Sequence, residues 1–351
     1  MTPSRHDTTP QFLLRPAQMS DVTALERFAE ASGHGLTTLP HDRNRLIRRV
    51  ENSLASFATD DPSGEETYLF VLEDRHSGRT IGVSGITAHA GFSERFYCFR
   101  NEFVVHRSDA LACSQRVHTL HPCHDLTGTT LLTSFYLEDE YAHTLAPQLL
   151  SRARLMFIAQ HSERFSDRIA SESPGLADGL GRCPFWDAVG RRFFAMDYPS
   201  VERMAEGRSK SFIAELMPNW PIYVPLLSSE AQWAIGQLHP DANLPFSILV
   251  DEGFEADTYV DIFDAGPIVV SRASSLRTVR GTVVMHIAPS SSESAAGTPH
   301  LVPNLQRNDF LATVIDADTP ESNLRISQNA ISALRLSPQA LVCALTAAER
   351  P

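Results

Sequence analysis

Apolar residues near the start of the chain follow first the spacing of a strand and then that of a helix. Phe12–Arg15 is a short apolar run that Pro16 closes. From Ser20 to Ala31 the apolar residues recur at helical spacing, and Ser20 and Asp21 are of types that cap helix N-termini. The pattern predicts a strand followed by an amphipathic helix. The apolar face of that helix consists of Val22, Leu25, Phe28 and Ala29.

Strand-like segments come next, and a strand-helix unit follows them. Thr67–Glu73 and Thr80–Thr87 are rich in β-branched and aromatic residues, and the turn residues His76–Gly78 lie between them. These segments predict an antiparallel hairpin. Leu131–Leu137 predicts a central strand, after which the apolar residues from Leu149 to Gln160 fall on successive helical turns.

Pro184 marks the start of a further helix, because a proline in the first helical turn lacks only an N–H that the helix does not use. The apolar residues after Pro184 recur on one face of the predicted helix, which predicts that this face packs in the core. They are Phe185, Trp186, Val189 and Phe193.

Residue types that commonly start or end helices indicate two further helices, and a strand is predicted after them. Ser229 and Gln232 have the spacing of a capping box at the start of a short helix. A later helix, through Phe246–Leu249, should end at Gly253, a residue type that often follows a helix C-terminus. Tyr259–Phe263 then predicts a strand.

The order of strands and helices predicts an α/β fold of the α+β type, with a mixed sheet flanked by helices. We expect an N-terminal tail at residues 1–11 and a core at residues 12–280, whose two halves would meet near residues 200–227. The Ser-rich stretch PSSSESAAG is typical of a flexible connection, so residues 281–300 are predicted to be a linker. A small strand-rich piece, residues 301–351, follows it.

The charge of the chain excludes several classes of protein. A net charge of −12, an isoelectric point near 5.6 and the absence of a basic block would repel nucleic acid and anionic membrane surfaces. No apolar run approaches the roughly 18 residues of a membrane helix, and Met1–Gln11 is polar rather than a signal sequence. We therefore expect a cytoplasmic protein with no nucleic acid or membrane partner.

Motifs for nucleotide hydrolysis, serine hydrolysis and metal binding are missing or incomplete. Lys210, the only lysine of the chain, does not follow the glycine of a phosphate-binding loop, and no GxSxG sequence occurs. The five cysteines form no CxxC pair. His118, His121, Cys123 and His124 are close together, but a structural zinc site needs four ligands with supporting contacts. We interpret them as an incidental polar loop and predict no metal.

Several distinctive stretches lie in a fixed order along the chain. They are SGHGLTTLP (Ser32–Pro40), SLASF (Ser53–Phe57), YLFVLED (Tyr68–Asp74), DLTG (Asp125–Gly128), PFWDAVGRRFF (Pro184–Phe194), FIAELMPNWPIYVPLL (Phe212–Leu227), GQLHP (Gly236–Pro240) and EGFEADTYVDIFDAGP (Glu252–Pro267). Together they resemble the arginine N-succinyltransferase family, in register from about Phe12 to Arg280 and more loosely beyond. The resemblance implies a GNAT-like N-acyltransferase that transfers a succinyl group from succinyl-CoA, its co-substrate, to the α-amine of arginine.

The resemblance also implies roles for particular residues. His239, in GQLHP, matches the family's proton donor, and an imidazole that titrates near neutral pH suits proton transfer to the thiolate of CoA. Leu132 and Thr133, in the predicted central strand, match the segment that contacts CoA. In a GNAT-type sheet the central strands splay apart and admit the acyl-CoA arm.

One stretch departs from the family pattern. Single-subunit members carry a glycine-rich RxxGNG loop, whose backbone N–H groups receive the pyrophosphate of CoA at a helix start. Here residues 142–148 (AHTLAPQ) contain no glycine, Arg or Lys, and Pro147 removes one donor. With GFSERFY, FRNEFVVH, CHDLTG and LLTSFY, this loss resembles the α subunit of the two-subunit arginine/ornithine enzyme. It implies a β subunit that keeps the loop.

The sequence identifies the residues that bind the amine substrate less specifically. A guanidinium substrate would need planar carboxylate acceptors, although Asp261 and Asp264 fit equally well as turn or strand-edge residues. L-Arginine, L-ornithine and another amine remain open as acceptors. The alternative function is a pseudo-acyltransferase that binds or regulates a catalytic partner, and the apolar segment Phe212–Leu227 predicts self-association or a partner surface. The carboxylate candidates are Asp125, Glu172, Asp261 and Asp264.

Overall fold

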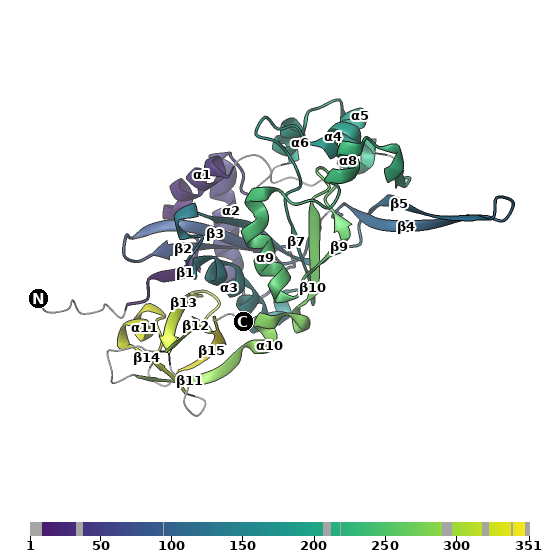
Figure 1. Cartoon of the computed structure of the whole chain (residues 1–351). Coiled ribbons are helices and arrows are strands. Elements are labelled where there is room, and N and C mark those ends of the chain that lie inside the picture. The colour runs from purple at the N-terminus through teal and green to yellow at the C-terminus, as the bar shows by residue number, and fades with distance from the viewer. Residues whose placement is uncertain are drawn as a thin grey trace, which may run out of the picture.

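A 15-stranded mixed sheet runs through the molecule (Figure 1). The computed structural model describes residues 9–32, 38–93, 95–205, 212–217, 219–289, 297–317, 323–337 and 340–347. The strands are β1 (Phe12–Pro16), β2 (Thr67–Asp74), β3 (Arg79–Thr87), β4 (Cys98–Ser108), β5 (Cys113–Cys123), β6 (Thr130–Leu137), β7 (Arg168–Glu172), β8 (Ile222–Tyr223), β9 (Glu255–Val260), β10 (Pro267–Arg272), β11 (Val283–Pro289), β12 (Thr298–Pro303), β13 (Ala312–Ala317), β14 (Asn323–Ile326) and β15 (Leu341–Thr346). Their order is β14-β11-β15-β12-β13-β1-β2-β3-β6-β7-β10-β9-β4-β5-β8.

The helices vary from short turns to the long segments that cover the sheet. They are α1 (Val22–Ala31), α2 (Arg43–Ala58), α3 (Ala146–Gln160), α4 (Pro184–Ala188), α5 (Gly190–Phe194), α6 (Tyr198–Ala205), α7 (Phe212–Leu216), α8 (Ser229–Ala234), α9 (Asn243–Glu252), α10 (Arg277–Gly281) and α11 (Gln328–Ala333). Within the described ranges, none of them is long and apolar enough to cross a membrane.

Helices cover both faces of the N-terminal strands, and the side chains of β2 show how. Tyr68, Phe70 and Leu72 belong to the core cluster that includes α3, whereas Leu69 and Val71 belong to the one that includes α1 and α2. Because both faces are covered, β2 is a nearly continuous apolar run. The predicted mixed α/β fold is confirmed, and the strands and helices expected for the N-terminal half lie close to their predicted positions.

The helix predicted after Pro184 is interrupted, which changes its buried face. α4 ends at Ala188 and α5 begins at Gly190, where a side-chain Cβ would lie 2.1 Å from the Trp186 ring. Phe185, Trp186 and Val189 are buried as expected. The prediction for Phe193 is wrong, because the break shifts the helical register. Phe193 is exposed and Phe194 is buried in its place.

Two predicted element ends are displaced by local hydrogen bonds. α8 is capped by Ser228 rather than Ser229, since the Ser228 hydroxyl accepts the Ala231 N–H at 3.3 Å. The strand expected at Tyr259–Phe263 is wrong in its second half, because β9 ends at Val260. Beyond it, the Asp261 carboxylate accepts the Phe263 N–H at 2.7 Å and closes a turn.

The segment expected to be a linker contains strands. β11 and the start of β12 occupy half of residues 281–300, while residues 290–296, which hold most of the Ser-rich stretch, lie outside the described residues. β11 pairs with β14 and β15, and β12 pairs with β13 and β15. β13 also pairs with β1, so the C-terminal strands continue the sheet of the core. Apolar residues that alternate along β11 explain why this segment forms a strand.

Serines of α2 provide hydrogen-bond acceptors for the backbone of β2. Ser53 Oγ accepts the Leu69 N–H at 2.8 Å, and Ser56 Oγ accepts the Thr67 N–H at 3.1 Å. Because Ser53 is fully buried, we expect Ser53→Ala to leave a buried N–H without an acceptor and to lower the free energy of unfolding by about 1–3 kcal/mol. Urea denaturation measures this loss. The exposed Ser229→Ala change, expected within about 0.5 kcal/mol, is the control.

Candidate functional site

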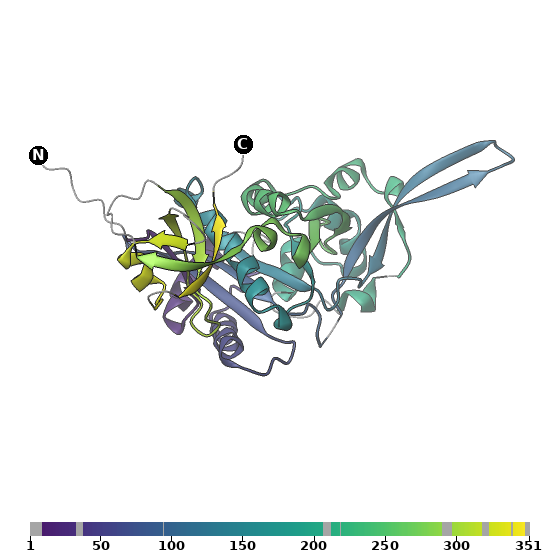
Figure 2. The same cartoon turned by 90° about the horizontal axis from the view of Figure 1, so that it is seen from below.

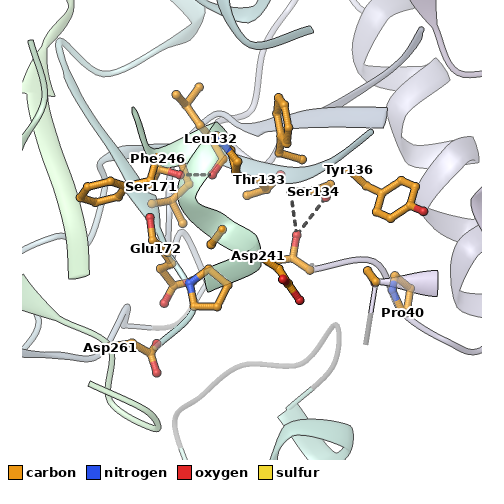
Figure 3. Close-up of a pocket in the computed structure, with 18 of the residues that line it drawn as sticks. Pro40, Leu132, Thr133, Ser134, Tyr136, Ser171, Glu172, Asp241, Phe246 and Asp261 are labelled. Atoms are coloured by element: carbon orange, nitrogen blue, oxygen red, sulfur yellow. Dashed lines mark hydrogen bonds between the residues drawn. The ribbon is translucent and has the colours of Figure 1, made fainter. Parts of the chain in front are cut away.

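A cavity of about 1260 Å³ lies beside the C-terminal half of β6 (Figure 3). Residues 131–137 of β6 line it, and residues 240–246, which lead into α9, form another wall. α2 contributes several basic side chains, and the ends of β7 and β9 contribute carboxylates. Elements that are far apart in the sequence therefore meet around one cavity.

The central strands separate at this cavity. β6 and β7 are parallel and are paired over three residues only, the last pair being Leu132 with Ser171. Ser171 Oγ donates to the Leu132 carbonyl at 3.2 Å across that last pair. Thr133, the next residue, already lines the cavity without a partner in β7 among the described residues. The splayed strand predicted at this place is present, with Leu132 and Thr133 at the point of separation.

A bulge in β6 lies next to the point of separation. Ser134 has φ of +57°, a left-handed conformation that is unusual for a residue other than glycine, and the pairing with β3 shifts register there. The Ser134 N–H donates to Thr38 Oγ1 at 3.0 Å, and the two hydroxyl groups lie 2.9 Å apart. These contacts compensate for a backbone conformation that costs about 1–3 kcal/mol.

Arginine side chains from α2 and α3 contact the same stretch of β6. Arg49 donates to Ser134 Oγ at 2.5 Å and lies 3.5 Å from Thr133 Oγ1. Arg154 donates to the Thr133 carbonyl at 3.4 Å. Burial lowers the pKa of Arg49 to about 10 and that of Arg154 to about 9. Both side chains line the cavity and give this side of it a positive charge.

Carboxylates lie on the other side of the cavity. Glu172, the last residue of β7, lines it together with Asp261 and Asp264 from the turn after β9 (Figure 3 labels Glu172 and Asp261). The cavity is therefore bordered by cations from α2 and α3 and by anions from the end of β7 and the adjoining turn. Of the predicted substrate-binding carboxylates, these are the ones that the structure brings together.

Asp264 is largely occupied by contacts within the protein. Its carboxylate accepts the N–H groups of Gly175 and Gly266, both at 2.7 Å, and the Tyr198 hydroxyl at 3.2 Å. Burial, with the Asp264 charge as the next cause, raises the pKa of Tyr198 well above its ordinary value. At Gly266 a Cβ would lie 2.3 Å from the Ser173 carbonyl, so the two loops pack backbone to backbone. This geometry favours the turn interpretation for Asp264.

His239 lies at the rim of the cavity, before the short 3₁₀ helix Pro240–Ala242. The ring Nδ1 of His239 accepts the backbone N–H of Asp241 at 3.2 Å, and the backbone N–H of His239 donates to the Pro174 carbonyl at 2.9 Å. Because Nδ1 is an acceptor, the neutral ring carries its proton on Nε2. Pro240 and Asp241 line the cavity, whereas His239 itself is not among the lining residues of the described chain.

Asp125 lies apart from this cavity. Its carboxylate pairs with Arg100 at 2.8 Å and is 3.4 Å from the Tyr259 hydroxyl. It borders a separate cavity of about 410 Å³ that Cys123 and His124 also line. The histidines of this region have different partners, since His118 stacks on Phe103 and His124 Nε2 lies 3.1 Å from Arg95. The described residues contain no group of three or more potential metal ligands.

The start of α3 has few backbone donors to offer a phosphate. The Ala146 N–H is already bound by Thr144 Oγ1 at 3.1 Å, and Pro147 in the first turn has no N–H. The Leu149 N–H donates to the Leu145 carbonyl. Among the first helical positions, Gln148 alone keeps an N–H outside these contacts.

The sequence interpretation did not include the cavity residues Arg49, Arg154 and Ser171. A signal for Arg154 was present but was shared with Arg152, because both charged residues stand in the mostly apolar α3, where nearly every position is buried. Arg49 lies in the Arg-rich α2, so no sequence feature distinguishes it from the other arginines of that helix. Only the fold shows which arginine of α2 faces β6.

A mixed sheet whose central strands separate beside a cavity fits the class of N-acyltransferases that the sequence resemblance implies. A family model described as arginine N-succinyltransferase beta subunit (AstA) matches residues 12–278. The α subunit of arginine N-succinyltransferase from Pseudomonas aeruginosa is 45% identical over 332 residues, 94% of this chain and 98% of that protein. The chain belongs to the arginine N-succinyltransferase family, as its resemblance predicted.

Other relatives agree with this assignment. The β subunit from Pseudomonas aeruginosa is 36% identical over 95% of this chain and 97% of that protein. Arginine N-succinyltransferase from Salmonella schwarzengrund is 34% identical over 92% of this chain and 94% of its own length. A solved structure of arginine/ornithine succinyltransferase subunit AI from Pseudomonas aeruginosa matches with a TM-score of 0.88 and 42% identity, covering 97% of this chain and 100% of that one. The greater identity to the α than to the β subunit agrees with the predicted α-type sequence.

Proposed function

We propose that this chain is a cytoplasmic subunit of an arginine N-succinyltransferase and transfers succinyl from succinyl-CoA to the α-amine of L-arginine or L-ornithine. The observation that carries the proposal is the opposed charge of the cavity at the separated strands, with Arg49 and Arg154 on one side and Glu172 on the other. An anionic acyl donor and a cationic amino acid both complement such a cavity. The names of the relatives agree with these substrates.

The residues around the cavity suit the steps of acyl transfer. The neutral amine attacks the thioester carbon, and the resulting oxyanion needs an oriented donor. The nitrogen then loses a proton to solvent, the carbonyl re-forms, and the C–S bond breaks as the CoA thiolate takes a proton. We assign the oxyanion to backbone N–H groups near Leu132 and Thr133, where the strands separate. The proton for the thiolate comes from Nε2 of His239 in its imidazolium form, which returns to the neutral ring, and Glu172 is the acceptor for the guanidinium of arginine.

A non-catalytic role is the second candidate, and one observation favours it. The first turn of α3 has lost two donors, at Ala146 and at Pro147, that a pyrophosphate would use. A chain that holds CoA poorly would act as a pseudo-acyltransferase that supports or regulates a β-type partner. The two candidates have the same fold and differ in whether this chain's own residues turn over substrate.

The surface offers a place for a partner. β4 and β5 form a long hairpin that projects from the body (Figure 2), and Phe103, Val105 and Leu111 on it are exposed. β5 pairs with β8, which belongs to the segment Phe212–Leu227. In that segment the described residues divide between core and surface: Ile213, Met217 and Val224 are buried, whereas Trp220 and Leu226 are 78% and 84% exposed. We propose this continuous surface for a β subunit or a second copy.

Turnover measured with and without a β-type subunit tests the proposed function. We expect this chain alone to release little CoA from succinyl-CoA, and the mixture to exceed the partner alone, with arginine or ornithine preferred over a peptide with a free N-terminal amine. A mixture that is faster than the partner alone, and equally fast when His239 of this chain is replaced, would favour the pseudo-acyltransferase. Faster reaction with the peptide amine would overturn the assigned acceptor.

A further inference from the structure

Arg49 and Arg154 are surrounded by neutral oxygens. Arg49 donates to the Thr38 carbonyl and to hydroxyl groups of β6, and Arg154 donates to the Thr133 carbonyl and to the backbone and hydroxyl oxygens of Ser151. Across the described residues, no carboxylate lies within ion-pair distance of either guanidinium. Two positively charged groups therefore enter the same cavity without a negative partner from the described parts of the protein.

Arg152, two positions before Arg154 on α3, shows how the fold treats a buried guanidinium that has a structural role. Its Nε lies 2.8 Å from Glu252, and both side chains are almost completely buried. Arg154 is buried to the same degree but has no such carboxylate. A buried charge that is unpaired is unfavourable, so the charge on Arg154 needs another explanation.

The position of the two guanidinium groups indicates which part of a ligand they face. Both contact Thr133, the first residue after the last pair of β6 with β7. Under the proposed function, a thioester carbonyl held at Leu132 and Thr133 leaves the rest of its acyl chain beside these side chains. The Phe135 ring, 5.7 Å from the Arg154 guanidinium carbon, supports the plane of that group.

We propose that Arg49 and Arg154 bind the terminal carboxylate of the acyl group and thereby select an acyl donor with a free carboxylate, such as succinyl-CoA, over neutral acyl-CoA. The proposal rests on the proposed function and adds the residues that recognise the donor. Planar guanidinium groups bind a carboxylate through paired, charge-assisted hydrogen bonds. The phosphates of CoA and the α-carboxylate of the amino acid are the other possible anions, and the experiment separates them.

The experiment measures binding of succinyl-CoA, butyryl-CoA and CoA to this chain by calorimetry, with titrations that extend into the millimolar range. Butyryl-CoA has the same number of acyl carbons and no terminal carboxylate. We expect the unmodified chain to prefer succinyl-CoA by about 10- to 100-fold, and Arg154→Met and Arg49→Met each to remove most of that preference. Arg43→Met, at an exposed position of α2 that does not line the cavity, should leave the ratio unchanged.

Each other outcome has a distinct meaning. Equal binding of succinyl-CoA and butyryl-CoA by the unmodified chain would overturn the proposal and leave the proposed function intact. Weaker binding of all three CoA ligands in Arg154→Met and Arg49→Met would assign these residues to the phosphates instead. Agmatine lacks the α-carboxylate of L-arginine. If the unmodified chain prefers L-arginine over agmatine and the same variants lose that preference, Arg49 and Arg154 bind the carboxylate of the amino acid. No binding of any CoA ligand would overturn the proposed function as well. Far-ultraviolet circular dichroism checks that each variant is folded. If Arg49→Met does not fold, Arg49→Lys replaces it, because lysine keeps the positive charge but lacks the planar guanidinium group.

Discussion

The isolated chain should bind succinyl-CoA about 10²- to 10⁴-fold more weakly than a family subunit that carries the glycine-rich loop. At the start of α3, one backbone donor is bound by Thr144 and another is removed by Pro147. Each lost charge-assisted hydrogen bond removes about 1.5–3 kcal/mol, and about 1.4 kcal/mol corresponds to a factor of ten. Calorimetry with succinyl-CoA on each subunit separately gives the ratio of the two dissociation constants.

A change within the loop provides the matched test of this explanation. Pro147→Ala restores a backbone N–H at the helix start without adding charge, and it should tighten CoA binding by about tenfold. Ala142, which lines the cavity nearby, gives a neutral control as Ala142→Ser. Micromolar binding by the unmodified isolated chain would contradict the argument and would show that CoA is held in another way.

Replacement of His239 by Asn should lower the turnover of the two-subunit complex by about 10²- to 10⁴-fold, the usual contribution of a general acid. Asn is also a favourable residue before a helix, so its side chain can keep the Asp241 N–H bond that His239 Nδ1 accepts. The change therefore removes the Nε2 proton and little else. Steady-state rates of CoA release measure the loss, and the dissociation constant for succinyl-CoA should stay within about threefold.

The control for this change lies in the same loop. Asp241→Asn keeps the backbone N–H and alters only a carboxylate that is 3.8 Å from His239 Nδ1 and 72% exposed, so its effect on rate should be small. Unchanged turnover in His239→Asn would show that this chain does not supply the acid. That result would support the pseudo-acyltransferase.

The fold was predictable where the pattern of side chains is set by burial. β2 and α3 are buried at most positions. The β-branched and aromatic residues of β2 and the helical spacing of apolar residues in α3 identified them. The ends of elements were less predictable because single hydrogen bonds decide them. Ser228 and Ser229 are chemically equal as caps, and Asp261 ended β9 by binding the Phe263 N–H. Nothing in the local sequence distinguishes these outcomes from their neighbours.

The candidate site was predictable mainly through resemblance. Leu132 and Thr133 were placed at the separated strand by their match to the family, and the pairing of β6 with β7 ends there. Arg49 was not found, because its relation to Ser134 joins residues 85 positions apart. Asp125 was grouped with the cavity carboxylates by residue type alone, and it lies elsewhere with Arg100. Charge and residue type suggest chemistry, but only the fold determines which groups meet.

The pairing of β1 with β13 has a consequence for the synthesis of this protein. The Thr313 hydroxyl donates to the Phe12 carbonyl, across 301 positions of the sequence. Contacts of such long sequence separation form slowly, since the intervening chain must be ordered first. One edge of β1 therefore stays unpaired on the ribosome until nearly the whole chain has been translated, and during that time it is a site where another nascent strand can add.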